Sequence, residues 1–181
     1  MTGKDSELEK IINGCLQNDR VSQRQLYDKY SSRMFAVCRR YANSDEEAED
    51  MLMVGFMNVF KGLKSYSWDG AFFTWLTGVM MRTAISYYRS TKRFRNELPM
   101  GDEWDNEDVL LAEENIVTNL EAKSIIELMD QMPDFSRVVF NMKEIEGYKL
   151  VEIAQMLDKK EGTIRVAYMR ARKWLADRLL R

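Results

Sequence analysis

The chain has 181 residues, of which 45% are hydrophobic and 31% are charged, and its formal net charge at pH 7 is −2. This length allows one domain or two small ones, with enough apolar side chains to bury a core. There is no histidine, and Cys15 and Cys38 lack the paired spacing of metal ligands. The composition therefore argues against a histidine-dependent enzyme and a cysteine metal site, and we expect neither a metal nor a cofactor.

Hydropathy along the chain is typical of a helical protein. No stretch approaches the ~20 consecutive apolar residues of a membrane span, and the polar N-terminus lacks a signal-peptide core. We therefore expect no membrane insertion and a cytoplasmic location. With only two prolines and apolar residues spaced at helical intervals along most of the chain, the sequence predicts an all-α fold.

Charge divides the chain into three parts. Residues 1–95 hold 15 basic and 11 acidic residues, residues 96–118 hold no basic and eight acidic residues, and residues 119–181 hold 12 and 10. The middle part is also turn-rich and has poor apolar periodicity. We therefore predict two small helical domains, 1–95 and 119–181, joined by a flexible acidic linker over 96–118.

Four helices are predicted before the linker, over about residues 6–17, 22–41, 45–63 and 72–93. Ser44 is the predicted N-cap of the third, because its hydroxyl can accept a hydrogen bond from the first turn. The acidic residues 45–47 that follow complement the helix dipole.

The third predicted helix has two unlike sides. The expected buried stripe consists of Ala48, Leu52, Phe56, Val59 and Leu63. The opposite side presents Asp50, Met53, Val54, Met57 and Lys61. Three of these five are apolar where solvent is expected. Either the helix is buried on both sides, or this side is a docking surface.

An aromatic loop and a basic helix follow. Tyr66 and Trp68 lie in the loop over residues 64–71, and residues 82–95 contain five basic residues and no acidic one. The outer cations of the fourth helix are Arg82, Arg89, Lys92 and Arg93. Cations that follow a backbone and rings that stack on unpaired bases suit single-stranded nucleic acid. The alternative is a solvated charged side next to core aromatics.

Residues 147–175 have the pattern of two helices joined by a tight polar turn at residues 158–160. The apolar positions of the two helices are Leu150, Ile153, Ala154, Met156 and Leu157, then Ile164, Ala167, Tyr168, Ala171 and Leu175. Residues 158–181 hold eight basic and three acidic residues. The stretch predicts a helix-turn-helix whose second helix lies in the DNA major groove.

At about 100° per residue, one side of this second helix faces away from the apolar stripe. It carries Gly162, Arg165, Val166, Met169, Arg170 and Lys173. Arg165 is the candidate for a bidentate guanine contact, and Val166 and Met169 can touch thymine methyl groups. We expect phosphate contacts from Lys160, Arg172 and Lys173, and we place Thr163 in the same DNA-binding set; any single arginine here could instead meet only phosphate or solvent.

Three groups of residues carry a resemblance to a known family. They are Glu47-Ala48-Glu49-Asp50 with Phe56; Phe73-Thr74-Trp75-Leu76 ending in Tyr87-Tyr88-Arg89; and Glu152-Ile153-Ala154 with Glu161-Gly162-Thr163-Ile164-Arg165 and Arg170-Ala171-Arg172-Lys173. In this order, and separated by an acidic linker, they resemble a bacterial extracytoplasmic-function (ECF) sigma factor of the sigma-70 superfamily. The resemblance extends from about Leu26 to Leu180.

The resemblance implies three roles and no chemistry of the chain's own. Glu49, Asp50, Met53, Val54 and Met57 would contact the clamp helices in the largest subunit of core RNA polymerase. The segment from Tyr66 to Arg93 would capture the melted minus-ten element of promoter DNA, and the helix-turn-helix would read the minus-thirty-five element as duplex. The family also implies an anti-sigma factor as a partner.

The chain departs from the family pattern at several positions. Met53 and Val54 stand where the family usually has Gln and an acidic residue, and Arg82 and Ser86 stand where it often has Asn and Asp. The other departures are Val166 and Ala167 in place of Ser and Arg, and Lys149 and Lys160 in place of Ser-type caps. Without such caps, both helix starts are expected to be weaker by ~1 kcal/mol.

Two other functions are open on the sequence. The departures at Met53 and Val54 favour a two-domain regulator that binds duplex DNA without joining polymerase. A nucleic-acid enzyme has less support, because the chain has no histidine, no cysteine cluster and no clear carboxylate constellation near the basic sides.

Overall fold

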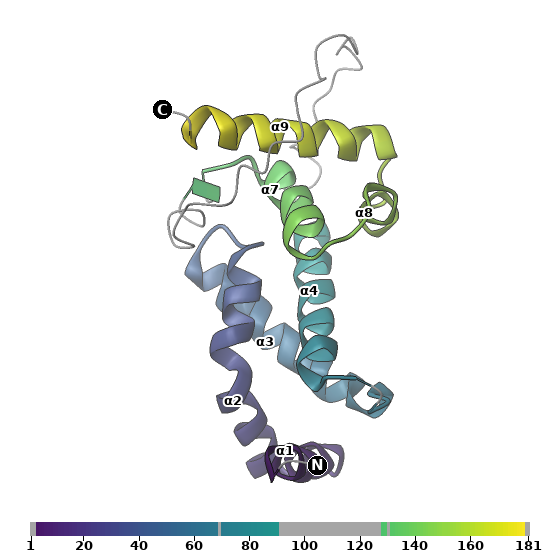
Figure 1. Cartoon of the computed structure of the whole chain (residues 1–181). Helices are drawn as coiled ribbons and strands as arrows, with labels where there is room; N and C mark the ends of the chain where they lie inside the picture. The colour runs from purple at the N-terminus through teal and green to yellow at the C-terminus, as the bar shows by residue number, and fades with distance from the viewer. Residues whose placement is uncertain (1–2, 69, 91–127, 130, 180–181) are drawn as a thin grey trace. The chain divides into compact units, whose positions relative to one another are not determined.

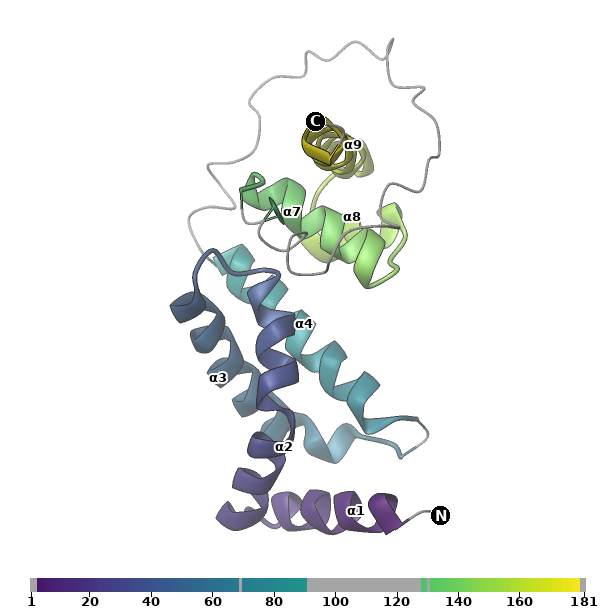
Figure 2. The ribbon, with the colours of Figure 1, turned by 60° about the vertical axis from the view of Figure 1, so that its left-hand side comes forward.

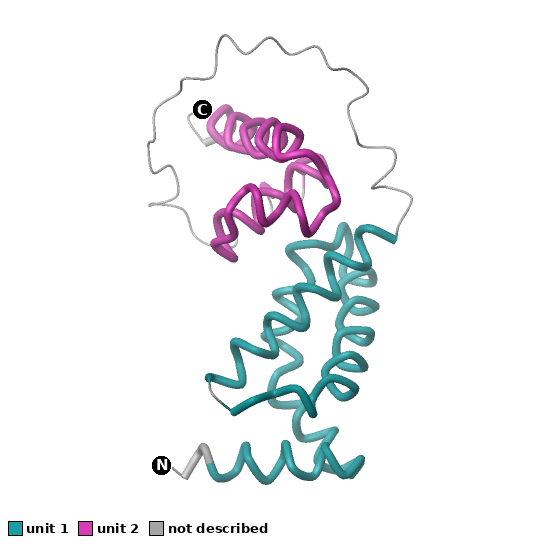
Figure 3. The backbone as a smooth tube through the Cα atoms, turned by 90° about the vertical axis from the view of Figure 1, so that its right-hand side faces the viewer, with its two compact units in different colours: residues 1–90 teal, residues 91–181 magenta. Residues whose placement is uncertain are grey.

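The structure is a computed structural model that describes residues 3–68, 70–90, 128–129 and 131–179. Every regular element among these residues is helical, which confirms the all-α prediction. The chain forms two compact units, residues 1–90 and 91–181 (Figure 3). The predicted linker over 96–118 lies outside the described residues.

The first unit is a helical bundle. Its elements are α1 (Gly3–Leu16), α2 (Arg20–Arg39), α3 (Asp45–Gly62), the short 3₁₀ turn η1 (Leu63–Ser65) and α4 (Phe72–Ser90). Helices α2, α3 and α4 pack alongside one another, and α1 crosses one end of α2 (Figure 1 and Figure 2). The core between them is built from Leu26, Met34, Val59, Leu76 and Met80, all fully buried.

Local capping sets where the helices of this unit begin. The Ser44 hydroxyl accepts a hydrogen bond from the Glu47 N–H at 3.2 Å, as predicted, and the Glu47 carboxylate reaches back to the Asn43 N–H at 2.7 Å. Helix α2 begins two residues earlier than the sequence predicts. Its cap is Asp19, whose carboxylate accepts from the Ser22 N–H at 2.9 Å and the Ser22 hydroxyl at 2.6 Å.

Helices α3 and α4 approach closely at Gly55. A Cβ atom there would lie 2.0 Å from the Met80 sulfur, so a larger residue would require the Met80 side chain to shift. The expected buried stripe of α3, from Ala48 to Leu63, is buried. Helix α4 buries a broad side that includes Met81, Ala84, Ile85 and Tyr88, whereas Val79 and Tyr87 are half-buried.

The second unit ends in the predicted helix-turn-helix. Its elements are α7 (Asp134–Phe140), the π-helical turn η2 (Asn141–Ile145), α8 (Leu150–Leu157) and α9 (Glu161–Leu179). Helix α9 packs on both α7 and α8 (Figure 1). Between α8 and α9, Asp158 takes the left-handed conformation with φ of 54°, and its N–H bonds back to the Ala154 carbonyl. This αL residue ends α8 and lets the chain turn sharply into α9.

In the core of the second unit, residues that precede α7 pack against α9. It contains Met129, Met132, Phe140, Ala171 and Leu175. Beside it, Arg137 is a buried cation with a side-chain exposure of 1%, paired with Asp134 at 3.2 Å. The sequence did not predict this burial. A buried charge needs a partner, and Asp134, three residues earlier on the same helix, supplies one.

Candidate nucleic-acid and protein interfaces

The outer side of α3 is exposed. We call Asp50, Met53, Val54 and Met57 the α3 face. Met53, Val54 and Met57 are 64%, 41% and 55% exposed. The alternative in which α3 is buried on both sides is therefore wrong, because α2 and α4 cover only the opposite stripe. Three neighbouring apolar side chains in solvent are a feature of interaction surfaces.

A groove between α2 and α3 borders the α3 face. It has a volume of about 460 Å³ and is lined by Tyr27, Ser31, Ser32, Phe35, Glu49, Leu52 and Met53. It brings together two residues predicted from sequence, Glu49 and Met53. Tyr27 was missed: its ring lies 4.7 Å from that of Phe56 and it remains partly exposed. Helical spacing along α2 could have predicted that Tyr27 lies near α3. It could not have predicted that the Tyr27 side chain stays exposed.

The predicted aromatic loop forms an aromatic cluster of Tyr66, Trp68, Phe72 and Trp75. The Tyr66 ring lies 5.1 Å, 5.3 Å and 5.6 Å from the rings of the other three, in that order. Its hydroxyl donates to the Gly70 carbonyl at 2.6 Å, which closes the loop. Tyr66 is thus held at the base of the loop by these contacts.

Trp68 is the outward member of the cluster. It is 48% exposed, and its backbone has φ of 64°. A bulky residue rarely takes this left-handed conformation, and such strain is found where function needs a side chain in one position. The loop therefore presents an indole ring to solvent above a packed aromatic base.

Two residues of this region were not among the predicted site residues. Phe73 is 40% exposed, and the Arg33 guanidinium lies 5.6 Å from its ring centre. The Phe73 ring is also 6.4 Å from that of Tyr30, which joins it to the aromatic cluster through Phe72. Arg33 lies on α2, distant in sequence, so only the fold brings this cation to the aromatic residues.

The predicted cations of the fourth helix are only partly described. Arg82 and Arg89 lie on α4 and are exposed. Lys92 and Arg93 lie outside the described residues. The structure therefore places two of the four cations on the same unit as the aromatic cluster.

The outward side of α9 carries the predicted DNA-binding residues. We call Gly162, Arg165, Val166, Met169, Arg170 and Lys173 the α9 face; all are exposed except Met169, which is partly so. A Cβ atom at Gly162 would meet nothing within 4 Å, so the surface there is open to a close partner. Arg165 is paired with Glu161 at 2.8 Å, one turn earlier on the helix.

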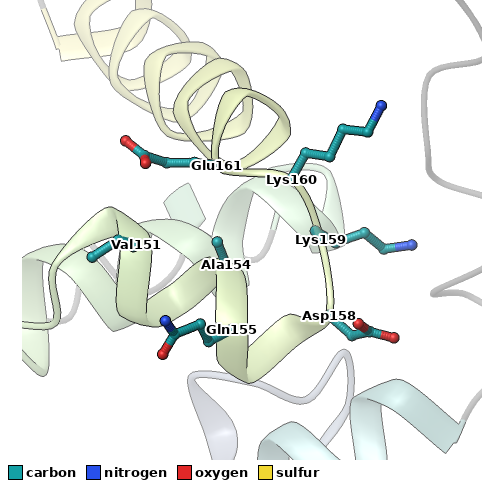
Figure 4. Close-up of a pocket in the computed structure, with 7 residues that line it drawn as sticks. All are labelled: Val151, Ala154, Gln155, Asp158, Lys159, Lys160 and Glu161. Atoms are coloured by element: carbon teal, nitrogen blue, oxygen red, sulfur yellow. The ribbon is translucent and has the colours of Figure 1, made fainter.

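The turn before α9 forms a second groove, shown in Figure 4. It has a volume of about 460 Å³ and is lined by Val151, Ala154, Gln155, Asp158, Lys159, Lys160 and Glu161. Lys159 and Lys160 extend to the same side of the turn (Figure 4). Cations beside the free N–H groups of a helix start favour phosphate, which fits the role predicted for Lys160. Thr163 follows in the first turn and is half-buried.

The back of α9 is fastened to η2. The Tyr168 hydroxyl donates to Glu144 Oε1 at 2.5 Å. Burial, and then the hydrogen bond to Glu144, raise the pKa of Tyr168 to about 12. The Arg172 guanidinium lies 5.9 Å from the Tyr168 ring centre. Arg172 is half-buried, whereas Lys173 is exposed.

Lys149 begins α8 without a side-chain cap, as its residue type implies. The Lys149 N–H donates to the Glu152 carboxylate at 2.7 Å, which supplies half of a capping box. Glu152, a motif residue, thus has a structural role in starting the helix-turn-helix.

Among the residues that the structure describes, no group of three or more Cys, Asp or Glu side chains could hold a metal ion. None of the helices in the described ranges has the length and apolar content needed to cross a bilayer.

Two family models match the chain. The model of sigma-70 region 2 matches residues 26–94, and that of sigma-70 region 4 matches residues 122–175. Full-length relatives include the ECF RNA polymerase sigma-E factor of Haemophilus influenzae, 23% identical over 94% of this chain and 94% of that protein. The ECF RNA polymerase sigma-E factor of Escherichia coli K12 is 24% identical over 93% and 92%.

Solved structures are similar to the chain as well. One is CnrH in complex with the cytosolic domain of CnrY, with 16% identity, coverage of 93% of this chain and 94% of that chain, and a TM-score of 0.46. Another is RpoE in complex with the anti-sigma factor NepR from Bartonella quintana, with 20% identity, coverage of 87% and 95%, and a TM-score of 0.49.

Proposed function

Since the chain belongs to the ECF type of sigma factor in the sigma-70 family, we propose that it divides promoter recognition among three surfaces. Residues 1–95 form the region-two domain, which docks on polymerase and holds the melted minus-ten element. Residues 119–181 form the region-four domain, which reads the minus-thirty-five element. Residues 96–118 connect the two.

The observation that carries this proposal is the exposed apolar α3 face. Met53, Val54 and Met57 contact the clamp helices in the largest subunit of core RNA polymerase, with Glu49 and Asp50 at the edge. The usual polar contacts of the family are replaced here by Met53 and Val54, so the interaction depends more on apolar burial. Methionine suits such a surface because its flexible thioether adapts to a partner's shape.

The aromatic cluster and the cations of α4 hold the melted strand. Trp68 stacks on an unpaired base, and Tyr66 holds the loop that presents it. Arg82 and Arg89, with Lys92 and Arg93, follow the phosphates.

The α9 face reads duplex DNA. Arg165 contacts a guanine edge, Val166 and Met169 contact methyl groups, and Gly162 allows close approach. Lys160 and Lys173 contact phosphates, together with Thr163, Arg170 and Arg172. The Glu161–Arg165 pair must open first; both partners are exposed, so this costs little.

The chain itself catalyses no reaction in this proposal, because the polymerase forms the phosphodiester bonds. It acts in the cytoplasm, where core polymerase is. In the free protein an exposed apolar face is a liability, so we further propose that an anti-sigma factor covers the α3 face until transcription is required.

The test is run-off transcription of genomic fragments with purified core polymerase, with and without the chain. We expect transcripts from a defined promoter class only when the chain is present, and co-purification of the chain with core enzyme. A chain that binds duplex DNA but neither joins polymerase nor directs transcripts would be the regulator considered above.

A further inference from the structure

The methionines of this chain are sorted by exposure. Of the 13 in the sequence, Met1 and Met100 lie outside the described residues. The buried ones are Met34, Met51, Met80, Met81, Met129, Met132 and Met142. Met156 and Met169 are half-buried. Among the residues that the structure describes, the exposed methionines are Met53 and Met57.

These two thioethers share one surface. Met53 and Met57 are four residues apart on α3, so their side chains are neighbours on one side of the helix. Val54 completes the apolar part of that side. A small oxidant in solvent therefore reaches both sulfur atoms on the surface proposed to bind polymerase, while the core methionines are shielded.

The thiols do not compete for such an oxidant. Cys15 and Cys38 are both buried. Burial raises the pKa of the Cys15 thiol to about 11, with a further contribution from the nearby Asp19 carboxylate, and it raises the pKa of Cys38 to about 12. Because the thiolate is the reactive form, both cysteines stay unreactive near neutral pH. The exposed sulfur chemistry of the described residues is thus that of Met53 and Met57.

We propose that Met53 and Met57 are a reversible oxidation site that releases this sigma factor from core polymerase. The inference rests on the proposed docking role of the α3 face. Each thioether sulfur takes one oxygen atom from a peroxide and gives up two electrons, and the peroxide is reduced to water or an alcohol. A methionine sulfoxide reductase with a thiol donor returns each sulfoxide to the thioether and releases water.

The sulfoxide changes the surface in the way that matters for docking. It replaces a flexible apolar side chain with a polar one whose oxygen must lose its hydration in an apolar contact. The helix itself tolerates the change, because both side chains point into solvent. Oxidation therefore weakens binding without unfolding α3, as a switch requires.

The test treats the intact protein with hydrogen peroxide and maps each methionine by peptide mass spectrometry. We expect sulfoxide at Met53 and Met57 well before the seven buried methionines. The dissociation constant for core polymerase should rise by about tenfold or more. Treatment with both methionine sulfoxide reductases should restore it.

Two variants make the result specific. In Met53→Leu/Met57→Leu, the dissociation constant for core polymerase is measured before and after peroxide treatment, and these two values should agree. The comparison is made within the variant, so its untreated affinity need not equal that of the natural chain. The control Met156→Leu keeps both exposed thioethers and should lose affinity on treatment as the natural chain does.

The outcomes separate this inference from the proposal on which it rests. Untreated protein that does not bind core polymerase overturns the docking role and the switch together. Protein that binds, and still binds equally well once both methionines are sulfoxides, overturns the switch alone. So does a peroxide effect that persists in the paired leucine variant.

Discussion

The α3 face and the α9 face are both outward sides of long helices whose other sides form a core, yet their chemistry is opposite. Met53, Val54 and Met57 give the first an apolar surface. The second carries Arg165, Arg170 and Lys173. Apolar contact gains free energy in proportion to buried area and depends little on salt, whereas phosphate contact releases counterions and weakens steeply as salt rises. The apolar α3 face therefore suits a protein partner that is the same at every promoter. The basic α9 face suits DNA, where one sequence must be distinguished from others.

The two faces also differ in how they are held when unbound. Arg165 on the α9 face is engaged by Glu161, and Tyr168 behind it is bonded to Glu144. Met53 and Met57 instead extend freely from α3. In the proposed function, binding of DNA by α9 would therefore exchange existing polar contacts for new ones, whereas binding of polymerase by α3 would only add contacts.

The largest expected effect is on docking. Replacing Met53 and Met57 together by Lys should weaken binding to core polymerase by about 2–4 kcal/mol, because central apolar anchors carry much of an interface's energy. The loss should be similar at low and high salt. Titration with labelled core enzyme measures it, and circular dichroism should show unchanged helix content.

A matched control lies on α2. Val21 is as exposed as Met53, and Val21→Lys adds one positive charge, half of that added by the Met53/Met57 pair, at an exposed position outside the α3 face. It should leave core affinity within about 0.5 kcal/mol. Equal losses in this variant and in the Met53/Met57 pair would mean that charge, and not the α3 face, causes the effect.

The α9 face should give effects that differ in kind. Arg165→Ala should cost about 1–3 kcal/mol on the cognate site and relax preference at one base pair. Lys173→Ala should weaken all sequences about equally and lower the salt slope by about one unit. Titrations on every single-base variant of the upstream element, at two salt concentrations, decide between them. A uniform loss in Arg165→Ala would make Arg165 a phosphate ligand.

The aromatic cluster lies in the same unit as the α3 face and also exposes an apolar side chain, the Trp68 ring, but its proposed partner is nucleic acid. Trp68→Ala should remove about 1–3 kcal/mol of stacking and reduce open-complex formation, while duplex binding by the α9 face is unchanged. Permanganate footprinting reports the melted bases. Normal reactivity with the variant would show that Trp68 does not hold the open strand.

The smallest effect should come from behind the α9 face. Tyr168→Phe removes the hydrogen bond to Glu144 and should destabilise the protein by about 1 kcal/mol in urea unfolding at neutral pH. The pKa of Tyr168 is raised above its usual value of 10 to about 12. The contribution of Tyr168 is therefore complete below pH 10 and is lost as pH rises through 12.

Ultraviolet titration of Tyr168 tests the same bond directly. Glu144→Gln should lower the pKa of Tyr168 toward 10 but not fully, because burial is the larger cause of its rise. An unchanged pKa in this variant would show that Glu144 does not hold the hydroxyl in solution.

Spacing in the sequence was enough to predict the helices of the first unit, the helix-turn-helix, and the outward sides of α3 and α9. Helical periodicity groups residues 3.6 to a turn, so the buried stripe of α3 and the outward side of α9 follow from spacing alone. Caps are equally local: Ser44 begins α3 as predicted, because donor and acceptor are three residues apart. The motif order gave the family.

The tertiary structure decided which of these sides stay open and how each side chain is used. Spacing could not say whether a second layer covered Met53 and Met57, since that depends on helices distant in sequence. For the same reason it placed Tyr66 and Trp68 alike, while packing holds one at the base of the loop and exposes the other. The Arg33 cation likewise meets Phe73 only because folding brings α2 and α4 together, and Arg137 is buried only because the core of the second unit assembles around it.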